Sequence, residues 1–254
     1  MRLKKVGVQW DGIHQLLLHD EIIEEHLPET WLFNRESFHW MWGRYPELVL
    51  KPTGERDGAG QIKLRRVDQH RAEIQVDMKG FRMPTGELFP RLQRMTKKAK
   101  TPYLLQQAVP RAELLGLPFE VRVLVYRVEP KRAEWRVLGM LAKVMGEGEG
   151  VDPKKFKGDC LSLTEALRDS NVNHLDLKRT TETFATLSIR SAERLGQTFP
   201  RHRMLGFDFA IDPSGWVWLL EAYPKPSLPS FMEQLRKKDY SQYREVEKMV
   251  RKHG

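Results

Sequence analysis

Two stretches of this sequence combine residue types that could handle phosphate and a metal ion. The first begins with Lys51, which follows the apolar residues 48–50 and precedes the glycine-rich segment 53–60. A lysine at the end of a strand offers a positive charge to phosphate, and glycines let backbone N–H groups approach it closely. The Gly-Lys-Ser/Thr sequence of a Walker A loop is missing. The segment is therefore either a phosphate-binding turn of another kind or an ordinary hairpin turn.

The second stretch indicates a β-hairpin that carries two carboxylates. Asp208 and Glu221 flank a turn at 212–215 (Asp-Pro-Ser-Gly), whose composition favours a tight reversal. In several strand registers the two side chains come close together, where their oxygens could hold Mg²⁺. Their neighbours are apolar, and a buried carboxylate is costly unless it is paired or bound to a metal. The other interpretation is an edge hairpin with Asp208 in a salt bridge and Glu221 at a strand end.

The elements that must position these residues alternate along the chain. Apolar or alternating runs predict strands at 48–50, 61–67, 74–78, 103–107, 119–128, 135–145, 204–211 and 216–221. Periodicity and capping residues predict helices at 35–44 after the cap Asn34, after a cap at Thr85, after the capping box of Ser162 and Glu165, at 181–197 and at 230–252. Antiparallel groups of strands interrupted by helices favour an α+β fold over a doubly wound parallel sheet. A seam near residues 100–102 indicates two lobes.

The composition excludes several classes of protein. A chain of 254 residues can bury a sizeable core, and its net charge of +9 indicates anionic partners. The single cysteine, Cys160, excludes an intrachain disulfide and a cysteine-rich zinc site. Since we find no export signal and no apolar run long enough for a membrane span, the cytoplasm is the expected location.

Basic stretches at 91–100 and 233–254 raise the question of nucleic acid as a partner. They lack the interleaved exposed aromatic residues of a single-strand binder, so we interpret them as solvated helix faces. A nucleic-acid binder is the weakest of the functional hypotheses.

Five segments follow the order of motifs in one known family. They are 26–30 (His-Leu-Pro-Glu-Thr), 49–52 (Val-Leu-Lys-Pro) with the glycines after it, 103–107 (Tyr-Leu-Leu-Gln-Gln), 119–125 (Phe-Glu-Val-Arg-Val-Leu-Val) and 205–226. Through them the chain from 26 to 231 resembles the ATP-grasp fold, and specifically the bacterial YheC/YheD family associated with endospore coats. Each pattern is weak alone, but their common order argues against coincidence.

The resemblance implies a nucleotide site. Lys51 is expected to contact nucleotide phosphate, with Gly58 and Gly60 in the loop that folds over it. The other implied contacts are Gln106, Gln107 and the backbone near Val109 beside adenine, and Glu120 at the acidic ribose position. Pairing across the sheet is the alternative for the two glutamines.

The resemblance also implies catalytic and metal-binding residues. Arg122 and Lys143, on adjacent strands, would face the transferred phosphoryl group or the acceptor, with solvated surface positions as the alternative. Asp208 and Glu221 would bind Mg²⁺. Tyr223 stands where the family has an asparagine metal ligand, and a neutral phenol is a poor ligand for Mg²⁺. We therefore expect one Mg²⁺ to bind well and a second weakly or not at all.

The implied architecture is two α+β lobes whose antiparallel sheets sandwich the nucleotide. The expected organisation is an N-terminal extension at 1–25, an N-lobe at 26–100, a C-lobe at 101–230 and a basic C-terminal helix at 231–254. The extension is shorter than the domain that usually precedes the lobes in this fold. Substrate contacts from such a domain would be absent or come from another chain.

The implied activity is that of an ATP-dependent carboxylate–amine ligase that works through an acyl phosphate, with ATP and Mg²⁺. Its acceptor would be an amino acid, a peptide or a protein, and the basic surface favours an acidic polypeptide. The alternative is a catalytically weakened nucleotide-binding protein or a spore-associated structural protein, because Tyr223 and the segment 151–158 depart from the family pattern.

Overall fold

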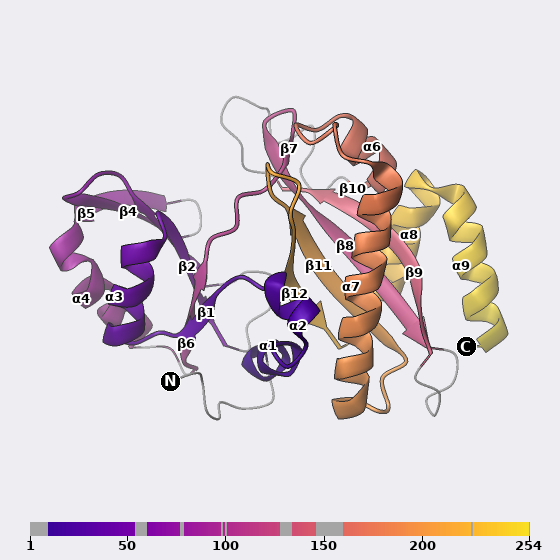
Figure 1. Ribbon diagram of the computed structural model, residues 1–254, viewed down its shortest axis with the longest axis horizontal. Coiled ribbons are helices and arrows are strands. Elements are labelled where there is room, and N and C mark those ends of the chain that lie inside the picture. Colours follow the sequence, from indigo (N-terminus) through magenta and orange to yellow (C-terminus); the bar gives the residue numbers. More distant parts are fainter. Residues whose placement is uncertain are drawn as a thin grey trace. The chain divides into compact units, whose positions relative to one another are not determined.

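The computed structural model of the chain describes residues 10–53, 60–76, 79–97, 99, 101–127, 134–145, 160–224 and 226–253. Contacts divide the chain into two compact units. Unit 1 consists of Met1–Gln15 and Pro28–Ala108, and unit 2 of Leu16–Leu27 and Val109–Gly254. Each unit has its own antiparallel sheet with helices packed against it, which confirms the predicted α+β class (Figure 1).

The sheet of unit 1 has its strands in the order β1-β6-β2-β3-β4-β5, all antiparallel. The strands are β1 (Thr30–Leu32), β2 (Glu47–Pro52), β3 (Ile62–Arg66), β4 (Arg71–Val76), β5 (Lys79–Pro84) and β6 (Tyr103–Gln107). Helices α3 (Arg35–Arg44) and α4 (Thr85–Thr96) pack on one face of this sheet (Figure 1). The core between them includes Phe38, Met41, Leu48, Leu50, Leu64, Ile74, Leu88 and Leu105.

The predicted helix starts in unit 1 are confirmed in one case and corrected in the other. Asn34 caps α3, because its side chain accepts from the Ser37 backbone N–H while the Ser37 side chain accepts from the Asn34 N–H. The expectation that Thr85 caps the next helix is wrong, since Thr85 is already the first residue of α4. Strand β5 stays paired with β4 up to Pro84, so the N-cap position falls on Pro84, which makes no side-chain capping hydrogen bond.

Strand β6 belongs to unit 1, whereas the expected lobe boundary at 100/101 assigned it to the second lobe. Its Gln106 stands opposite Val49 of β2 on one side and opposite Thr30 of β1 on the other. Contacts accordingly divide the chain between Ala108 and Val109. Pairing between segments so distant in sequence leaves no trace in local composition, which is why the boundary differs.

Glu29 connects the edge strand β1 to the rest of unit 1. Its carboxylate accepts hydrogen bonds from Trp31 Nε1 (2.8 Å), Trp40 Nε1 (3.3 Å) and Tyr45 Oη. Its backbone carbonyl accepts from the Gln107 N–H of β6. Burial alone would raise the pKa of Glu29, but the hydrogen bonds from the three aromatic side chains outweigh it and hold the pKa below its ordinary value. The sequence analysis missed this role.

We expect Glu29→Gln to lower the free energy of unfolding by about 1–3 kcal/mol, because the amide keeps the shape but loses the hydrogen bonds to a charged oxygen. A carboxylate with a lowered pKa contributes stability above its unfolded-state pKa and loses it as the pH falls through the folded-state value. The difference from the parent should therefore be complete at neutral pH and shrink as the pH falls below 4.5, the ordinary glutamate value.

Denaturant titrations at several pH values measure this difference. Glu36→Gln, at an exposed position in the first turn of α3, is the control and should change stability little. A difference for Glu29→Gln that stays constant down to strongly acidic pH would contradict the assigned role.

The sheet of unit 2 has the order β10-β9-β8-β11-β12, again antiparallel, and β7 pairs with β8. The strands are β7 (Glu113–Leu114), β8 (Leu117–Arg127), β9 (Trp135–Val144), β10 (Cys160–Ser162), β11 (Met204–Ile211) and β12 (Val217–Tyr223). The helices are α2 (Glu21–Glu25), α6 (Leu163–Arg168), α7 (Leu177–Thr198), α8 (Leu228–Lys238) and α9 (Tyr240–His253). Helix α1 (Trp10–Leu17) contains a boundary between the two units.

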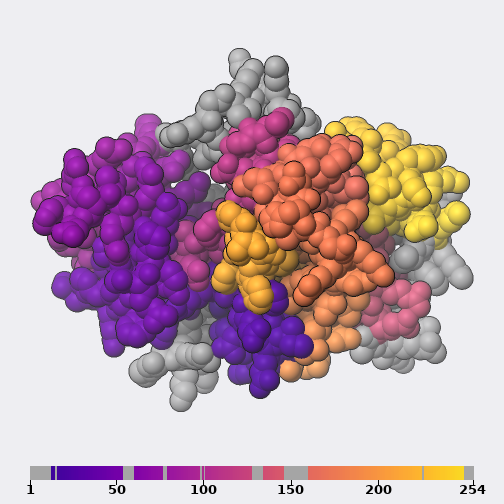
Figure 2. Space-filling model, turned by 45° about the horizontal axis from the view of Figure 1, so that its top comes forward, coloured from indigo at the N-terminus to yellow at the C-terminus, as the bar shows by residue number. Residues whose placement is uncertain are grey.

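The two faces of this sheet have different environments. Helix α7 packs on one face, where the rings of Phe184 and Phe209 lie 5.3 Å apart. Figure 2 shows this helix, in orange, on the surface of unit 2. On the opposite face α8 and α9 pack against an apolar area around Leu124 and Leu141. Polar residues of β8 lie next to that area on the same face.

Strand β8 shows the change of environment along its length. Phe119, Val121 and Val123 are buried, whereas Glu120 and Arg122 between them are half-buried. The expected alternation then stops, because every residue from 124 to 127 is buried. The C-terminal helices cover the second face of the sheet there. The strand ends at the buried Arg127, whose guanidinium donates to the His202 carbonyl.

The C-terminal segment forms two helices and not the single helix expected at 230–252. Helix α8 ends at Lys238, and the Asp239 side chain then accepts from the Gln242 backbone N–H at the start of α9. The break lets both helices place apolar residues, Phe231 and Val246 among them, in the same core. Among the helices of the described residues we find none with the length and apolar character that a membrane crossing requires.

Candidate functional site

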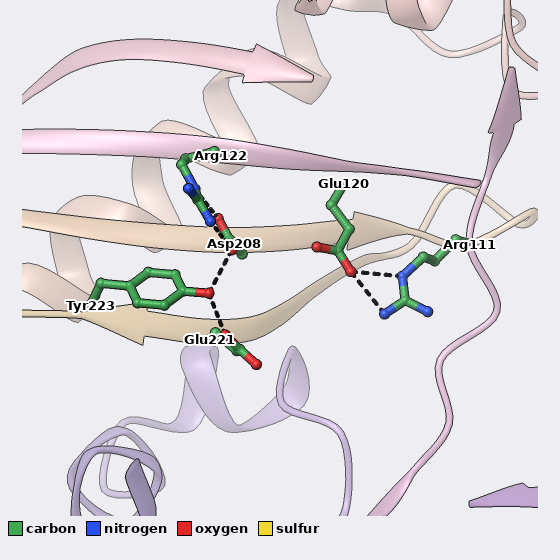
Figure 3. A network of polar contacts seen from close by, with 6 residues as sticks. All are labelled: Arg111, Glu120, Arg122, Asp208, Glu221 and Tyr223. Carbon is green, nitrogen blue, oxygen red and sulfur yellow. Dashed lines mark hydrogen bonds and ion pairs between the residues drawn. The ribbon is translucent and has the colours of Figure 1, made fainter. Parts of the chain in front are cut away.

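A row of charged side chains crosses three neighbouring strands of unit 2 (Figure 3). Asp208 on β11 stands opposite Glu221 on β12 and opposite Arg122 on β8. The β11–β12 register shifts directly after Asp208, between Asp208 and Phe209. The structure thus brings together the two carboxylates expected to bind a metal and the arginine expected to face the transferred group.

The Arg122 guanidinium forms a two-point ion pair with Asp208. Nε donates to Oδ1 and Nη2 to Oδ2, both at 2.7 Å. The Asp208 side chain is only 8% exposed, against 38% for Arg122. Hydrogen bonding to Asp208 outweighs burial and raises the pKa of Arg122 above its ordinary value, so the arginine stays charged. A planar guanidinium matches this geometry better than a lysine ammonium does.

Tyr223 links the two carboxylates. Its hydroxyl lies 2.8 Å from Asp208 Oδ2 and also hydrogen-bonds to Glu221 Oε2. Its ring lies under the guanidinium of Arg122, 5.2 Å from ring centre to Cζ. Burial, and then the charges of the two carboxylates, raise the pKa of Tyr223 above its ordinary value, so the phenol stays neutral. A single hydroxyl proton serves one carboxylate at a time.

Arg111 and Glu120 form a second ion pair beside this row (Figure 3). Arg111 Nε and Nη2 lie 2.9 and 2.8 Å from Glu120 Oε1. Glu120 also stands opposite Lys143 of β9, which is exposed. Since Glu120 and Arg122 are two residues apart on one strand, their side chains point to the same face of the sheet. Lys143 therefore belongs to this face as well.

The sequence analysis missed Arg111, although a signal for it exists. Strand β7 pairs with β8 so that Glu113 stands opposite Pro118, and the Phe119 N–H bonds to the Ala112 carbonyl. Extending that register brings Arg111 opposite Glu120. The reversal depends on Leu115 and Gly116, whose φ angles of 51° and 78° are both positive. A Leu-Gly pair is a weak turn signal, because leucine rarely adopts this conformation.

The predicted nucleotide residues Lys51, Gln106 and Gln107 lie in unit 1. Lys51 and Gln106 share the sheet face opposite the core, because Val49 stands opposite Gln106 and Lys51 opposite Leu104. Gln106 Nε2 donates to Thr30 Oγ1 (2.9 Å), and Gln107 Oε1 accepts from the Glu29 N–H (3.3 Å). Both side-chain amides therefore pair across the sheet with β1 and its flanking residue.

The surroundings of Lys51 include a buried histidine. Burial, together with the charge of Lys51, lowers the pKa of His14 to about 4. His14 is therefore neutral at physiological pH and adds no second positive charge there. Gly60, the predicted loop glycine, has a φ of +71°, a conformation that suits glycine. Its carbonyl accepts a hydrogen bond from Tyr103 Oη (3.3 Å).

Val109 lies in unit 2, in an apolar cluster with Ala210 and Leu220. Gly58 and the segment 151–158 lie outside the described residues.

The donor set at the hairpin fits a hard divalent cation, because it offers carboxylate oxygens from directly opposed positions. Within the described residues no group of three or more His, Cys, Asp and Glu could hold a metal ion. The protein would thus supply Asp208 and Glu221, and phosphate or water oxygens would complete the shell. Arg122 and Tyr223 already bond to the same carboxylates, so a cation would compete with them.

Comparison with known proteins shows the family of this chain. The profile of YheC/D-like ATP-grasp proteins matches residues 5–249. The chain belongs to this family. The endospore coat-associated protein YheD of Bacillus subtilis (strain 168) is 24% identical to it over 229 residues, which are 88% of this chain and 49% of YheD. The YheC/D-like chain thus spans about half the length of this curated relative.

Solved structures share the fold of this ATP-grasp protein. D-alanyl-alanine synthetase A from Vibrio cholerae O1 biovar eltor str. N16961 superposes with a TM-score of 0.53 at 13% identity, covering 94% of this chain and 62% of that one. The ATP-grasp ligase PsnB, in complex with minimal precursor, Mg and ADP, gives 0.52 at 12% identity, covering 93% and 56%. The family and the ATP-grasp fold predicted from the sequence are both confirmed.

Arg122→Ala should lower the free energy of unfolding of this ATP-grasp protein by about 1–3 kcal/mol, because Asp208 would stay buried without its cation. Arg136→Ala is the matched control. It pairs with Glu134, and each of the two side chains is 59% exposed. Such exposed ion pairs contribute at most about 1 kcal/mol to stability. Urea denaturation measures both variants, and a loss for Arg122→Ala no larger than for the control would contradict the pairing.

Proposed function

We propose that this protein is an ATP-dependent carboxylate–amine ligase. The γ-phosphoryl group of ATP moves to a substrate carboxylate, which leaves ADP and an acyl phosphate. An amine then attacks the acyl carbon, a C–N bond forms, and the C–O bond to phosphate breaks. Membership of the ATP-grasp family supports this class of reaction.

The observation that supports the proposal most is the row formed by Arg122, Asp208 and Glu221. It presents one guanidinium and two carboxylates on one face of a sheet, with hydrogen bonds that fix their orientation. Phosphoryl transfer depends on such positioned charge, because the negative charge of the transferred group must be neutralised. When bound at Asp208 and Glu221, Mg²⁺ would supply part of that neutralisation.

The other predicted residues have proposed roles in each of the two units. Arg122 and Lys143 bind the transferred phosphoryl group or the acceptor, and Glu120, oriented by Arg111, binds the ribose hydroxyls. Lys51 binds phosphate, with Gly58 and Gly60 in the loop beside it. Because the amides of Gln106 and Gln107 bond to residues at β1, the adenine contacts fall to the backbone near Val109.

We also propose an acidic peptide or protein as the acceptor, since the chain has a net charge of +9. The name of the relative YheD supports a role at the endospore coat.

A second candidate function is a nucleotide-binding protein with little or no turnover. The contact of Tyr223 with both hairpin carboxylates favours it, because a cation would have to displace the hydroxyl before it could bridge them. ATP binding without ADP release, in the presence of candidate amino acids and peptides, would support this second function over the first.

Lys51→Ala should weaken ATP binding about ten- to a hundredfold, because it removes a charge-assisted contact to phosphate. Calorimetric titration with Mg²⁺-ATP measures the change. Lys79→Ala is the control, since Lys79 is exposed on the edge strand β5, and it should bind like the parent. If Lys51→Ala also binds like the parent, Lys51 is not a phosphate ligand.

Glu221→Gln should abolish Mg²⁺-dependent ADP release, because it removes the charge of a metal ligand and keeps its shape. ADP is measured against Mg²⁺ concentration with an amino acid or acidic peptide as acceptor. Glu233→Gln, on the exposed side of α8, should leave the rate unchanged. Parental activity in Glu221→Gln would remove the hairpin from the mechanism.

A further inference from the structure

We propose that Tyr223 is an internal competitor of the divalent cation, occupying with its hydroxyl the place between Asp208 and Glu221 and thereby setting the cation affinity of the hairpin. The inference rests on the proposed function only in taking this hairpin as the cation site. Tyr223 is a positioning residue in this role, and not a ligand.

The backbone explains how the phenol reaches both carboxylates. Tyr223 follows Glu221 by two residues on β12, so both side chains point to the same face. The residue opposite Tyr223 on β11 is Gly206, and Asp208 is the next β11 residue on that face. Tyr223 thus stands diagonally opposite Asp208, and its hydroxyl reaches the Asp208 carboxylate across the two strands (Figure 3). The space over Gly206 itself is filled by Leu124 and Pro226.

The hydroxyl and a bridging cation exclude each other. Tyr223 Oη hydrogen-bonds to Oδ2 of Asp208 and to Oε2 of Glu221. Mg²⁺ binds carboxylate oxygens at about 2.0–2.1 Å, so an ion that bridges these same two oxygens needs the space that the hydroxyl oxygen fills. Binding therefore requires the phenol to move or the carboxylates to turn away from it.

The same hydroxyl also offsets the cost of two facing carboxylates. Arg122 supplies one positive charge to the row, through Asp208. Glu221 gains a donor from Tyr223, which lowers the need for a second cation nearby. Loss of the hydroxyl should thus destabilise the cation-free protein and favour the cation-bound form, two effects with the same origin.

Tyr223→Phe isolates this function of the side chain. It keeps the ring that lies 5.2 Å from the Arg122 guanidinium and removes only the hydroxyl. Tyr243→Phe is the matched control, because Tyr243 Oη also hydrogen-bonds to a carboxylate, Glu247 Oε1 at 2.8 Å, but within α9. The two substitutions delete the same atom in similar bonds, one in the hairpin and one in a helix.

The decisive measurement is Mn²⁺ binding to the nucleotide-free full chain, with free Mn²⁺ read by electron paramagnetic resonance. Tyr223→Phe should bind Mn²⁺ about tenfold more tightly than the parent, and Tyr243→Phe should bind like the parent. Adding Glu221→Gln to the parent or to Tyr223→Phe should remove the Mn²⁺ site. With the cation removed by a chelator, Tyr223→Phe should unfold at a lower temperature than the parent. Adding Mn²⁺ should then raise the thermal midpoint of Tyr223→Phe by more than it raises that of the parent.

Two outcomes would overturn the inference while leaving the cation site in place. Equal Mn²⁺ affinity in Tyr223→Phe and the parent means that the hydroxyl does not compete. Weaker binding in Tyr223→Phe means that the phenol is itself a ligand. If Mn²⁺ binds to none of the proteins, the inference also fails, and calorimetry with ATP then shows separately whether nucleotide binding survives.

A measurement on the parent keeps the inference testable if Tyr223→Phe does not fold. Mg²⁺ is transparent in the ultraviolet, so displacement of the phenol from two carboxylates should appear as a tyrosine difference spectrum on Mg²⁺ addition. Glu221→Gln should abolish that spectrum. Mg²⁺ binding detected by calorimetry without a tyrosine signal would overturn the inference.

Discussion

The burial of the Asp208 carboxylate is the constraint on which the site in unit 2 depends. Asp208 lies on the inner strand β11 with 8% of its side chain exposed, where an unpaired charge would be costly. Arg122 satisfies it from β8 and Tyr223 from β12. The three strands are therefore joined by side chains as well as by their backbone ladders. A change to any one partner leaves the others with unmet hydrogen bonds, which is why the row acts as one unit.

The C-terminal helices limit the charged row to one part of the sheet face. They bury one half of a sheet face around Leu124 and Leu141, and the polar residues occupy the neighbouring part of that face. Helix α7 covers the opposite face with apolar contacts such as Phe184 on Phe209. The charged row thus lies on a sheet whose other face is packed against the apolar side of α7. Such support keeps the charged groups oriented.

Unit 1 accommodates its polar groups differently. Glu29 is held by neutral aromatic donors, and the lowered pKa of His14 leaves this buried histidine uncharged near Lys51. The amides of Gln106 and Gln107 are engaged with β1 and its flanking residue. Of the motif residues 26–30, Glu29 and Thr30 bond to β6 and so help to hold this sheet together.

The sequence by itself determined the elements whose signals are local: the Asn34 cap, the capping box of Ser162 and Glu165, the 212–215 turn and the alternation that gives β8 its two faces. Its ordered motifs were also enough to identify the ATP-grasp family. Only the tertiary structure decided that Tyr223 joins the two carboxylates, that Arg111 pairs with Glu120, and that the C-terminal segment breaks in two. These features depend on strand register and on which part of a sheet face is covered. Both are set by packing between segments far apart in the chain, so the local signals that do exist, the Leu115-Gly116 turn and the Asp239 cap, are too weak to predict them.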